Sequence, residues 1–363
     1  MKFCFFHYSK ESLKVKVENH IFQIIYCKFP IFEVDLKYEE RVMANEVLNS
    51  ALKYLSNWYM QSVIEEVAVN RPGEVWLRLR GRRETPWVME KDKHLSRGYL
   101  TDIMNIIANS YEAPFDPATG VPVVYATLPG DHRFSGIAGK NVLYDNDDIE
   151  GGIALAIRTK KDSVDFDFAD YGLVKGEELK KLKSQQIELS SDPYQRLMDC
   201  IKRGDHILIS GATATGKTTF LNNILKLLSP NLRVITIEDS RELIVPQKNH
   251  VHLLLSRTEQ VNVFSYKDVI DLVVRMTPDA IMGGEISTDN AGAIWELMGT
   301  GHKHFYATIH AESAEGAYKA FIDRILHTFP ELDQQKTLEE MRKKLRVVQI
   351  GREGNIRAIT EIV

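Results

Sequence analysis

The chain has 363 residues, which is too many for one small core and predicts two domains of about 100–200 residues each. Its composition, 44% hydrophobic and 26% charged, excludes a disordered or fibrous chain, and its net charge of −4 gives no general sign of nucleic-acid binding. The three cysteines, Cys4, Cys27 and Cys200, are widely spaced, which excludes a disulfide framework and predicts a reducing compartment.

No stretch of the sequence reaches the ~18–20 uninterrupted apolar residues of a membrane-spanning helix. The longest candidate, residues 21–34, is interrupted by Lys28, Pro30 and Glu33. We therefore expect a cytoplasmic protein, which can still associate peripherally with a membrane complex.

The N-terminal part of the chain predicts an extension followed by a mixed domain. Residues 1–42 show no clear periodicity and are left as an unassigned extension, and residues 43–158 predict an α+β domain. Apolar residues at 48, 51, 52 and 55 have helical spacing, and Pro72-Gly73 between two apolar runs predicts a hairpin. Thr101 is the expected cap of a further helix. Short strands are expected at 123–128, 134–138 and 153–157.

A change of composition separates this domain from the C-terminal one. Residues 159–192 are rich in charge and predict a linker that holds one short helix over residues 175–183. Residues 193–363 alternate short apolar runs with segments of helical length, and the runs are 207–209, 234–237, 280–282 and 305–309. Strands that are apolar throughout and separated by helices predict a parallel sheet in an α/β domain.

The first chemistry-bearing motif follows the first of these strands. Residues 211–218 fit G-x-x-x-x-G-K-[ST], and an amphipathic helix follows them. Such a loop lets backbone N–H groups surround phosphate, while its lysine bridges the β- and γ-phosphates and its hydroxyl binds Mg²⁺. The residues expected to bind ATP are Gly211, Ala212, Thr213, Ala214, Thr215, Gly216, Lys217, Thr218 and Thr219.

Polar residues follow the other three strands, and ligands bind beyond the carboxyl ends of parallel strands. Glu285, after Gly283-Gly284, is the candidate that orients or deprotonates the attacking water. Glu238 and Asp239 are candidates to hold Mg²⁺ through water or to orient Glu285, and His310 is a candidate sensor of the γ-phosphate or a structural histidine. For Mg²⁺ we expect Thr218 as a direct ligand, and Asp239 and Glu285 as ligands through water.

A second interpretation of the histidines is a metal site. His302, His304 and His310 include alternate residues of one extended segment, which share a face. No cysteine accompanies them, and no nearby carboxylate has ligand spacing. We therefore favour the ATP-related interpretation.

The ordered set of motifs resembles the secretion-ATPase superfamily. The shared stretches are the P-loop, an Asp box at 237–243, a Walker B region at 275–285 and a His box at 300–311. Residues 66–76, 128–133 and 156–158 are similar to the traffic ATPases of type IV secretion and conjugation. The resemblance covers about residues 60–363.

This resemblance implies a RecA-like C-terminal P-loop domain with a smaller N-terminal α+β domain, assembled as a homo-hexamer. It also implies that Mg²⁺-dependent ATP hydrolysis takes place between the two domains, with Arg133 and Arg158 reaching the phosphates. The work would be pilus assembly or substrate transfer by a type IV secretion system, with other machine subunits at the inner membrane as partners.

The sequence departs from the family pattern at a few positions. Ala214 and His304 stand where glycine is usual, Thr277 stands where arginine is common, and Ser287 stands in place of an arginine. Lys217, Thr218 and Glu285 are all present. Three alternatives stay open: a pilus or type II secretion motor, a nucleic-acid-dependent RecA-like motor, and a nucleotide-gated assembly platform with slow turnover. The net charge of −4 and the lack of a basic-aromatic stripe argue against stable nucleic-acid binding.

Overall fold

The computed structural model describes residues 8–9, 12–17, 20–25, 46–80, 87–145, 151–160, 168–171, 173–179, 183–255 and 264–363. It divides into two compact units, Met1–Leu48 and Asn49–Val363. The first unit contains an antiparallel sheet of β1 (Tyr8–Ser9), β2 (Ser12–Val17) and β3 (His20–Ile25). The sequence patterns did not predict these strands.

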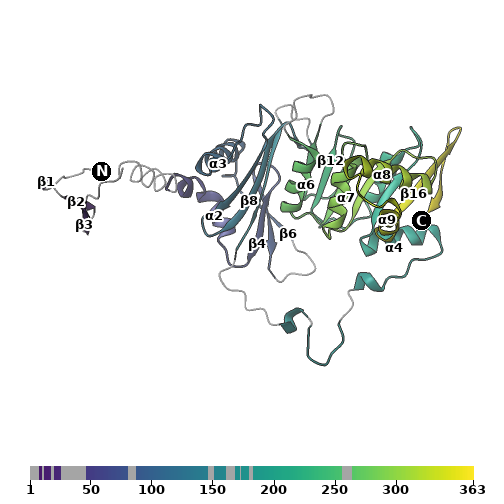
Figure 1. The fold of residues 1–363 in the computed structure, drawn as a ribbon, viewed down its shortest axis with the longest axis horizontal. Helices are drawn as coiled ribbons and strands as arrows, with labels where there is room; N and C mark the ends of the chain where they lie inside the picture. The colour runs from purple at the N-terminus through teal and green to yellow at the C-terminus, as the bar shows by residue number, and fades with distance from the viewer. Residues whose placement is uncertain are drawn as a thin grey trace. The chain divides into compact units, whose positions relative to one another are not determined.

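The second unit begins with an antiparallel sheet whose strand order is β6-β5-β4-β10-β8-β7. Its strands are β4 (Ile64–Val69), β5 (Glu74–Leu79), β6 (Trp87–Lys91), β7 (Val123–Leu128), β8 (His132–Gly139) and β10 (Gly152–Arg158). Helix α2 (Lys53–Tyr59) contacts β4, and α3 (Arg97–Ser110) contacts β7 and β10 (Figure 1). The expected hairpin and the three expected strands are therefore present.

The cap that we assigned to Thr101 is wrong. Ser96 is the N-cap of α3, because its side chain accepts a hydrogen bond from the backbone N–H of Tyr99. Thr101 lies inside the helix, where its hydroxyl donates to the carbonyl of Arg97. Both residues can cap a helix, so the local pattern did not separate them.

The larger sheet of this unit has the strand order β17-β16-β11-β15-β14-β12-β13-β9, and its six central strands are parallel. Its strands are β9 (Val142–Leu143), β11 (His206–Ser210), β12 (Val234–Glu238), β13 (His250–Leu254), β14 (Ala280–Glu285), β15 (Phe305–Ile309), β16 (Leu345–Glu353) and β17 (Ile356–Ile362). The α/β parallel sheet is confirmed, with β13, β16 and β17 as strands that we did not predict.

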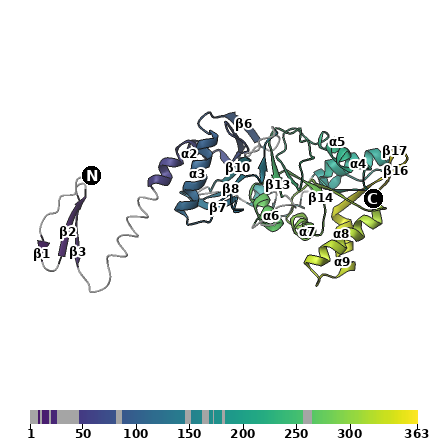
Figure 2. The same ribbon diagram turned by 90° about the horizontal axis from the view of Figure 1, so that it is seen from above.

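Helices cover both faces of this sheet (Figure 2). They are α4 (Pro193–Arg203), α5 (Lys217–Leu225), α6 (Tyr266–Arg275), α7 (Ala291–Gly299), α8 (Ala314–Thr328) and α9 (Gln334–Lys344). Ile207 and Ile209 pack in the same cluster as α4 and α5, whereas Leu208 packs with α6, α7 and α8. Alternate residues point to opposite faces, so a strand covered on both sides must be apolar at every position.

Strand β9 connects the two sheets. It comes from the chain between β8 and β10, yet it pairs with β13, with Leu143 opposite His252 and Val142 opposite Leu253. Ile137 and Ala154 of the smaller sheet also belong to the core cluster that contains α6. The two sheets of this unit therefore share a core, which the interpretation as two separate domains did not anticipate. The boundaries proposed at 43–158, 159–192 and 193–363 remain a prediction.

The segment between the sheets has little regular structure where it is described. Two 3₁₀ helices are present, η1 (Phe168–Tyr171) and η2 (Lys183–Gln186). Residues 175–179, part of the helix expected over 175–183, form turns and irregular backbone, and residues 180–182 lie outside the described residues. The charge pattern alone was a weak helix signal because it supplied no apolar face to pack.

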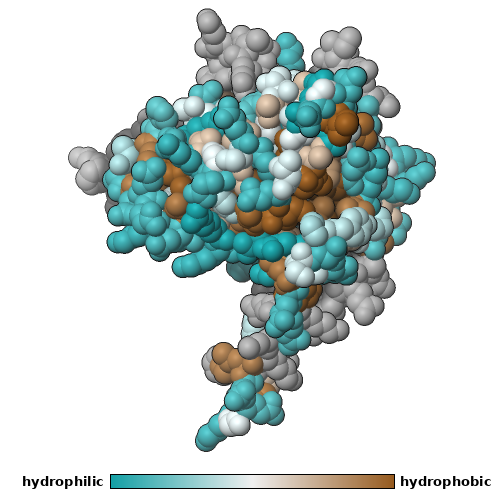
Figure 3. Space-filling model, turned by 90° about the vertical axis from the view of Figure 1, so that its right-hand side faces the viewer, coloured by the Kyte–Doolittle hydropathy of each residue, from teal (hydrophilic) through white to brown (hydrophobic). Residues whose placement is uncertain are grey.

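Apolar side chains gather near the centre of one face of the molecule, among hydrophilic neighbours (Figure 3). Within the described ranges, no helix has both the length and the apolar character required to span a membrane.

Candidate active site

The loop between β11 and α5 has the backbone of a phosphate-binding nest. Ala214 and Gly216 both have left-handed conformations, with φ of +61° and +89°. Such conformations turn successive N–H groups toward one point, at the N-terminus of α5. At Gly211 a Cβ atom would lie only 2.7 Å from the carbonyl oxygen of Ile350, so this position requires glycine for close backbone approach.

Lys217, the first residue of α5, is only 7% exposed, so it is less solvated than a loop lysine would be. Its Nζ donates hydrogen bonds to the carbonyls of Gly211 and Ala212 and to Nδ1 of His310, each at 3.0 Å. Burial lowers the pKa of Lys217, and the negative charge of Glu285 opposes that shift. The three hydrogen bonds hold the ammonium group between the start of the loop and His310.

Glu285 and His310 lie beside Lys217, at the ends of β14 and β15. His310 Nε2 is 3.6 Å from Oε1 of Glu285, while its Nδ1 accepts from Lys217. The pairing of β14 with β15 is irregular between Met282 and Glu285, and such an irregularity redirects the side chain that follows it. The structure thus brings together Lys217, His310 and Glu285, which are far apart in the sequence.

These residues line a pocket of about 270 Å³. The lining residues are Ala214, Gly216, Lys217, Thr218, Thr219, Asp239, Ser240, Glu242, Gly284, Glu285, Thr308 and His310. The pocket combines loop backbone, one ammonium group, two hydroxyl-bearing helix residues and three carboxylates. This chemistry suits a nucleotide phosphate accompanied by a hard cation.

The donor set for magnesium includes one carboxylate that the motifs did not predict. Thr218 Oγ1 donates a hydrogen bond to Oε2 of Glu242 at 3.1 Å. Asp239 and Glu285 line the same pocket. Mg²⁺ prefers oxygen ligands and keeps several waters, so a hydroxyl surrounded by carboxylates that bind through water fits this ion.

Glu238 does not reach the pocket, although it was expected there. It is 2% exposed, and its Oε2 accepts hydrogen bonds from the backbone N–H groups of Glu242 and Leu243 at 2.8 Å. Its Oε1 accepts from the hydroxyl of Thr236 at 2.7 Å. Despite burial, these hydrogen bonds and that from His252 lower the pKa of Glu238. Glu238 therefore holds the loop that presents Asp239 and Glu242.

The histidines of the predicted His box do not converge on a metal. His302 Nδ1 lies 2.6 Å from the hydroxyl of Thr300, and His304 Nδ1 lies 3.0 Å from that of Tyr306. His310 faces Lys217 instead. The alternative metal interpretation of these three residues finds no support in this geometry.

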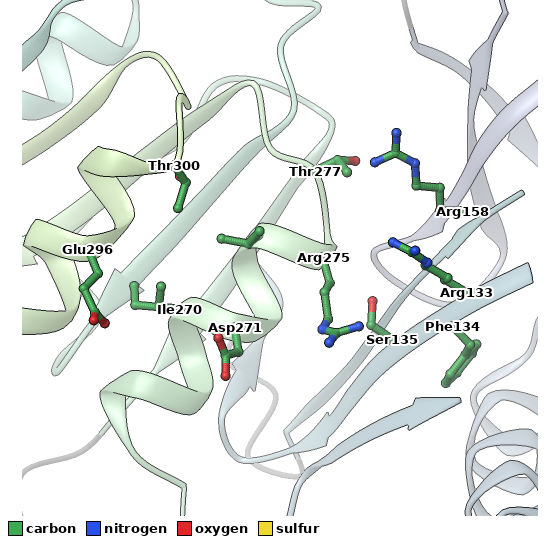
Figure 4. Close-up of a pocket in the computed structure, with 11 residues that line it drawn as sticks. Arg133, Phe134, Ser135, Arg158, Ile270, Asp271, Arg275, Thr277, Glu296 and Thr300 are labelled. Atoms are coloured by element: carbon green, nitrogen blue, oxygen red, sulfur yellow. The ribbon is translucent and has the colours of Figure 1, made fainter. Parts of the chain in front are cut away.

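Arg133 and Arg158 lie away from the pocket around Lys217. They are directly opposite each other on β8 and β10 and line a different pocket of about 450 Å³. Figure 4 shows both guanidinium groups extending from the strands toward Thr277 and the end of α6, where Arg275 lies. Within one chain the structure does not bring these two arginines to the P-loop.

The β16–β17 hairpin contributes residues that the motifs missed. Arg352 Nη1 donates to the carbonyl of Ala214 at 3.4 Å, and Arg357 Nη1 would lie 3.2 Å from a Cβ at Gly216. The sequence signal was weak, since arginines near a C-terminus are exposed by default. Their place beside the loop follows only from the strand order.

Comparison with known proteins supports a family assignment. Residues 56–325 match the family described as Type II/IV secretion system protein. The chain is 28% identical over 291 residues to Protein VirB11 of Rhizobium radiobacter, covering 76% of this chain and 80% of that protein. It is also 28% identical over 284 residues to the type IV secretion system protein PtlH of Bordetella pertussis, covering 73% and 78%.

The fold is similar to that of a solved structure, the VirB11 ATPase from the Brucella suis type IV secretion system in complex with sulphate. The TM-score is 0.76 at 23% identity, and the match covers 90% of this chain and 96% of that chain. This similarity confirms the expected fold class.

Proposed function

The chain belongs to the type II/IV secretion system protein family, and from that membership we propose that it is an oligomeric, Mg²⁺-dependent ATPase that powers a type IV secretion system. The matches to VirB11 and to the type IV secretion system protein PtlH extend over 76% and 73% of this chain, and they support the choice of a type IV system. The hydrogen bond from Lys217 to His310, with Glu285 beside that histidine, is the observation that carries the proposal of ATP hydrolysis.

The lysine contacts suggest how the site responds to nucleotide. Lys217 directs its ammonium group at three protein acceptors, and one of them is His310. A γ-phosphate oxygen is a stronger acceptor than a neutral imidazole because it is charged. Arrival of ATP therefore draws Lys217 away from His310, and His310 becomes available to contact the phosphate or Glu285. This exchange makes His310 a sensor of the γ-phosphate.

Glu285 is the residue placed to act on water. Glu285 lines the pocket around Lys217, and within the described part of the chain no backbone N–H donates to its carboxylate as two do to that of Glu238. It can therefore orient the attacking water and accept its proton. When Mg²⁺ is bound it neutralises phosphate charge, and Thr218, Asp239 and Glu242 are the residues that would hold it and its waters.

The wider assembly is part of the same proposal. We infer a homo-hexamer that works with other secretion subunits at the cytoplasmic side of the inner membrane. The match to PtlH, a type IV secretion system protein, supports work beside other subunits of such a system.

The proposal is tested with two variants of the full chain. Glu285→Gln should bind ATP as the wild type does but release phosphate about 100–10,000-fold more slowly, because it removes the base and keeps the shape. Lys217→Ala should lose ATP binding itself. Binding is measured by equilibrium titration, and hydrolysis by phosphate release with and without a magnesium chelator.

His302→Ala is the matched control, since its histidine lies in the same box but outside the pocket. Thermal unfolding checks that every variant folds. A Glu285→Gln variant with wild-type phosphate release would contradict the assigned role of Glu285 and favour a nucleotide-gated platform.

A further inference from the structure

Two histidines and a carboxylate meet at the edge of the large sheet, outside the ATP pocket. His250 and His252 are alternate residues of β13, so their side chains share a face. Asp145 follows β9, which pairs with β13. One ligand atom from each of the three lies within 4.8 Å of the others, and this is the one such group of histidine, cysteine or acidic residues among the described ranges.

The backbone holds one ring nitrogen of His250, and the other, Nε2, which faces Arg71, is the nitrogen that can act as a ligand. Its Nδ1 lies 2.6 Å from the carbonyl oxygen of Gln247, which can only accept, so Nδ1 carries the proton. Nε2 then carries the lone pair, and Oδ2 of Asp145 lies 3.1 Å from it.

His252 presents its second nitrogen in the same way. Its Nδ1 lies 2.9 Å from the hydroxyl of Thr236, and that hydroxyl donates to Glu238. The hydroxyl oxygen must therefore accept the proton of Nδ1. Nε2 of His252 has no hydrogen-bond partner among the residues that the structure describes, although the residue is 1% exposed, and it lies 3.6 Å from Oδ1 of Asp145. An unpartnered polar atom at this depth requires an explanation.

The spacing fits a tetrahedral transition metal. Zinc–nitrogen bonds of about 2.0–2.1 Å place neighbouring ligands of a tetrahedron roughly 3.3–3.5 Å apart. A single carboxylate oxygen, Oδ1 of Asp145, lies 3.2 Å from Nε2 of His250 and 3.6 Å from Nε2 of His252. Metal-binding histidines also donate their other N–H to a carbonyl or to a carboxylate network, as both histidines do.

We propose that His250, His252 and Asp145 form a binding site for a divalent transition metal of the zinc class, with water as the fourth ligand. Asp145 has a side-chain exposure of 45%, so the site opens to solvent at that carboxylate. The metal joins the segment after β9 to β13 and so strengthens the connection between the two sheets. The site rests on residues that play no direct part in ATP hydrolysis.

In the structure, which holds no metal, the guanidinium group of Arg71 is the positive charge beside Asp145 and His250. Arg71, in the turn after β4, donates from Nη1 to Oδ2 of Asp145 at 3.0 Å, and its Nη2 lies 3.1 Å from Nε2 of His250. Arg241 donates to the other carboxylate oxygen, Oδ1, at 3.1 Å. Metal and Arg71 therefore compete for the same two acceptors, whereas Arg241 contacts Asp145 without blocking His250.

The test is a titration of the full chain with Zn²⁺ in excess Mg²⁺, which occupies oxygen-only sites. The wild type should bind one Zn²⁺ per chain, and Co²⁺ as a probe should develop the intense visible absorption of tetrahedral coordination. His252→Ala and Asp145→Asn should each weaken Zn²⁺ binding by about 10–100-fold or more. Arg71→Ala should tighten it, because it removes the competing cation.

His94→Ala is the matched control. Nδ1 of His94 lies 2.8 Å from Oδ1 of Asp92, so His94 is also a histidine paired with an aspartate. The His94→Ala variant should leave the Zn²⁺ titration unchanged. Zn²⁺ should raise the melting temperature of the wild type and not of Asp145→Asn, since a ligand of the folded state stabilises it. Absence of micromolar binding in both wild type and Arg71→Ala, or equal affinity of His252→Ala and wild type, would overturn the site.

Discussion

At the scale of single residues, the backbone explains where the P-loop departs from its family. Ala214 has φ of +61°, a conformation in which an L side chain crowds its own backbone. His304, the other residue in a usual glycine position, has φ of +54°. Both positions therefore carry backbone strain that glycine would remove. The strain at Ala214 lies in the P-loop, whereas the strain at His304 lies before β15, outside the pocket around Lys217.

We predict that Ala214→Gly raises the free energy of unfolding by about 1 kcal/mol, because glycine adopts this conformation without a Cβ clash. Gly216→Ala is the contrasting variant: with φ of +89° and Arg357 only 3.2 Å from the added Cβ, it should lower the free energy of unfolding. Urea titrations of the three proteins measure both changes. Equal stability of Ala214→Gly and wild type would mean that the strain is relieved elsewhere.

At the scale of elements, a buried carboxyl group connects the two sheets. Glu66 lies on β4, is 2% exposed, and accepts a hydrogen bond from the hydroxyl of Thr277, which follows α6. Thr277 stands where an arginine is common in the family, so a neutral donor faces Glu66. Burial raises the pKa of Glu66 to about 7, although Arg233 and Arg78 oppose that shift.

The sign of this shift predicts a pH dependence of stability. Because the folded state holds the proton more tightly than the unfolded chain, the stabilisation is fully present below about pH 4.5 and is lost as the pH rises through about 7. Glu66→Gln, which resembles the protonated form, should remove this loss. The difference in the free energy of unfolding between Glu66→Gln and the wild type should grow from pH 5 to pH 8 by on the order of 2–3 kcal/mol.

Urea titrations at both pH values measure this difference, and Glu65→Gln on the neighbouring position is the control. A difference that stays constant with pH would show that Glu66 is ionised throughout the range.

At the scale of the whole molecule, the position of Arg133 and Arg158 bears on whether they act on the nucleotide of their own chain or on that of another chain. Arg133 and Arg158 line a pocket with Arg275, whereas the P-loop pocket has none of the three in its lining. Strand β9 and the shared core hold the two sheets of one chain together. We therefore expect the arginines to act on the nucleotide of a neighbouring chain in the assembly.

The prediction is functional complementation. Arg133→Ala should hydrolyse ATP slowly with nearly normal nucleotide affinity, because a charge supplied to the transition state matters more than one supplied to the ground state. Mixing Arg133→Ala with Lys217→Ala chains should restore part of the phosphate release, since some sites would combine an intact lysine with an intact arginine from another chain. Mixtures no more active than either variant alone would place both groups in one chain.

The P-loop, Glu285 and His310 were predictable because their positions depend on local rules. Apolar runs separated by helical segments indicate parallel strands, and the carboxyl ends of parallel strands meet at one edge. That edge is where Lys217, Glu285 and His310 lie together. The sequence by itself therefore determined the α/β fold class and the main residues of the pocket.

Only the tertiary structure decided which polar groups are buried and what they face. Glu238 and Asp239 are neighbours in the sequence, yet one is enclosed by backbone N–H groups and the other lines the pocket. Asp145 meets His250 across 105 residues of chain because β9 crosses to the edge of the other sheet. Such contacts depend on long-range strand pairing and shared packing, and no period of the sequence encodes them.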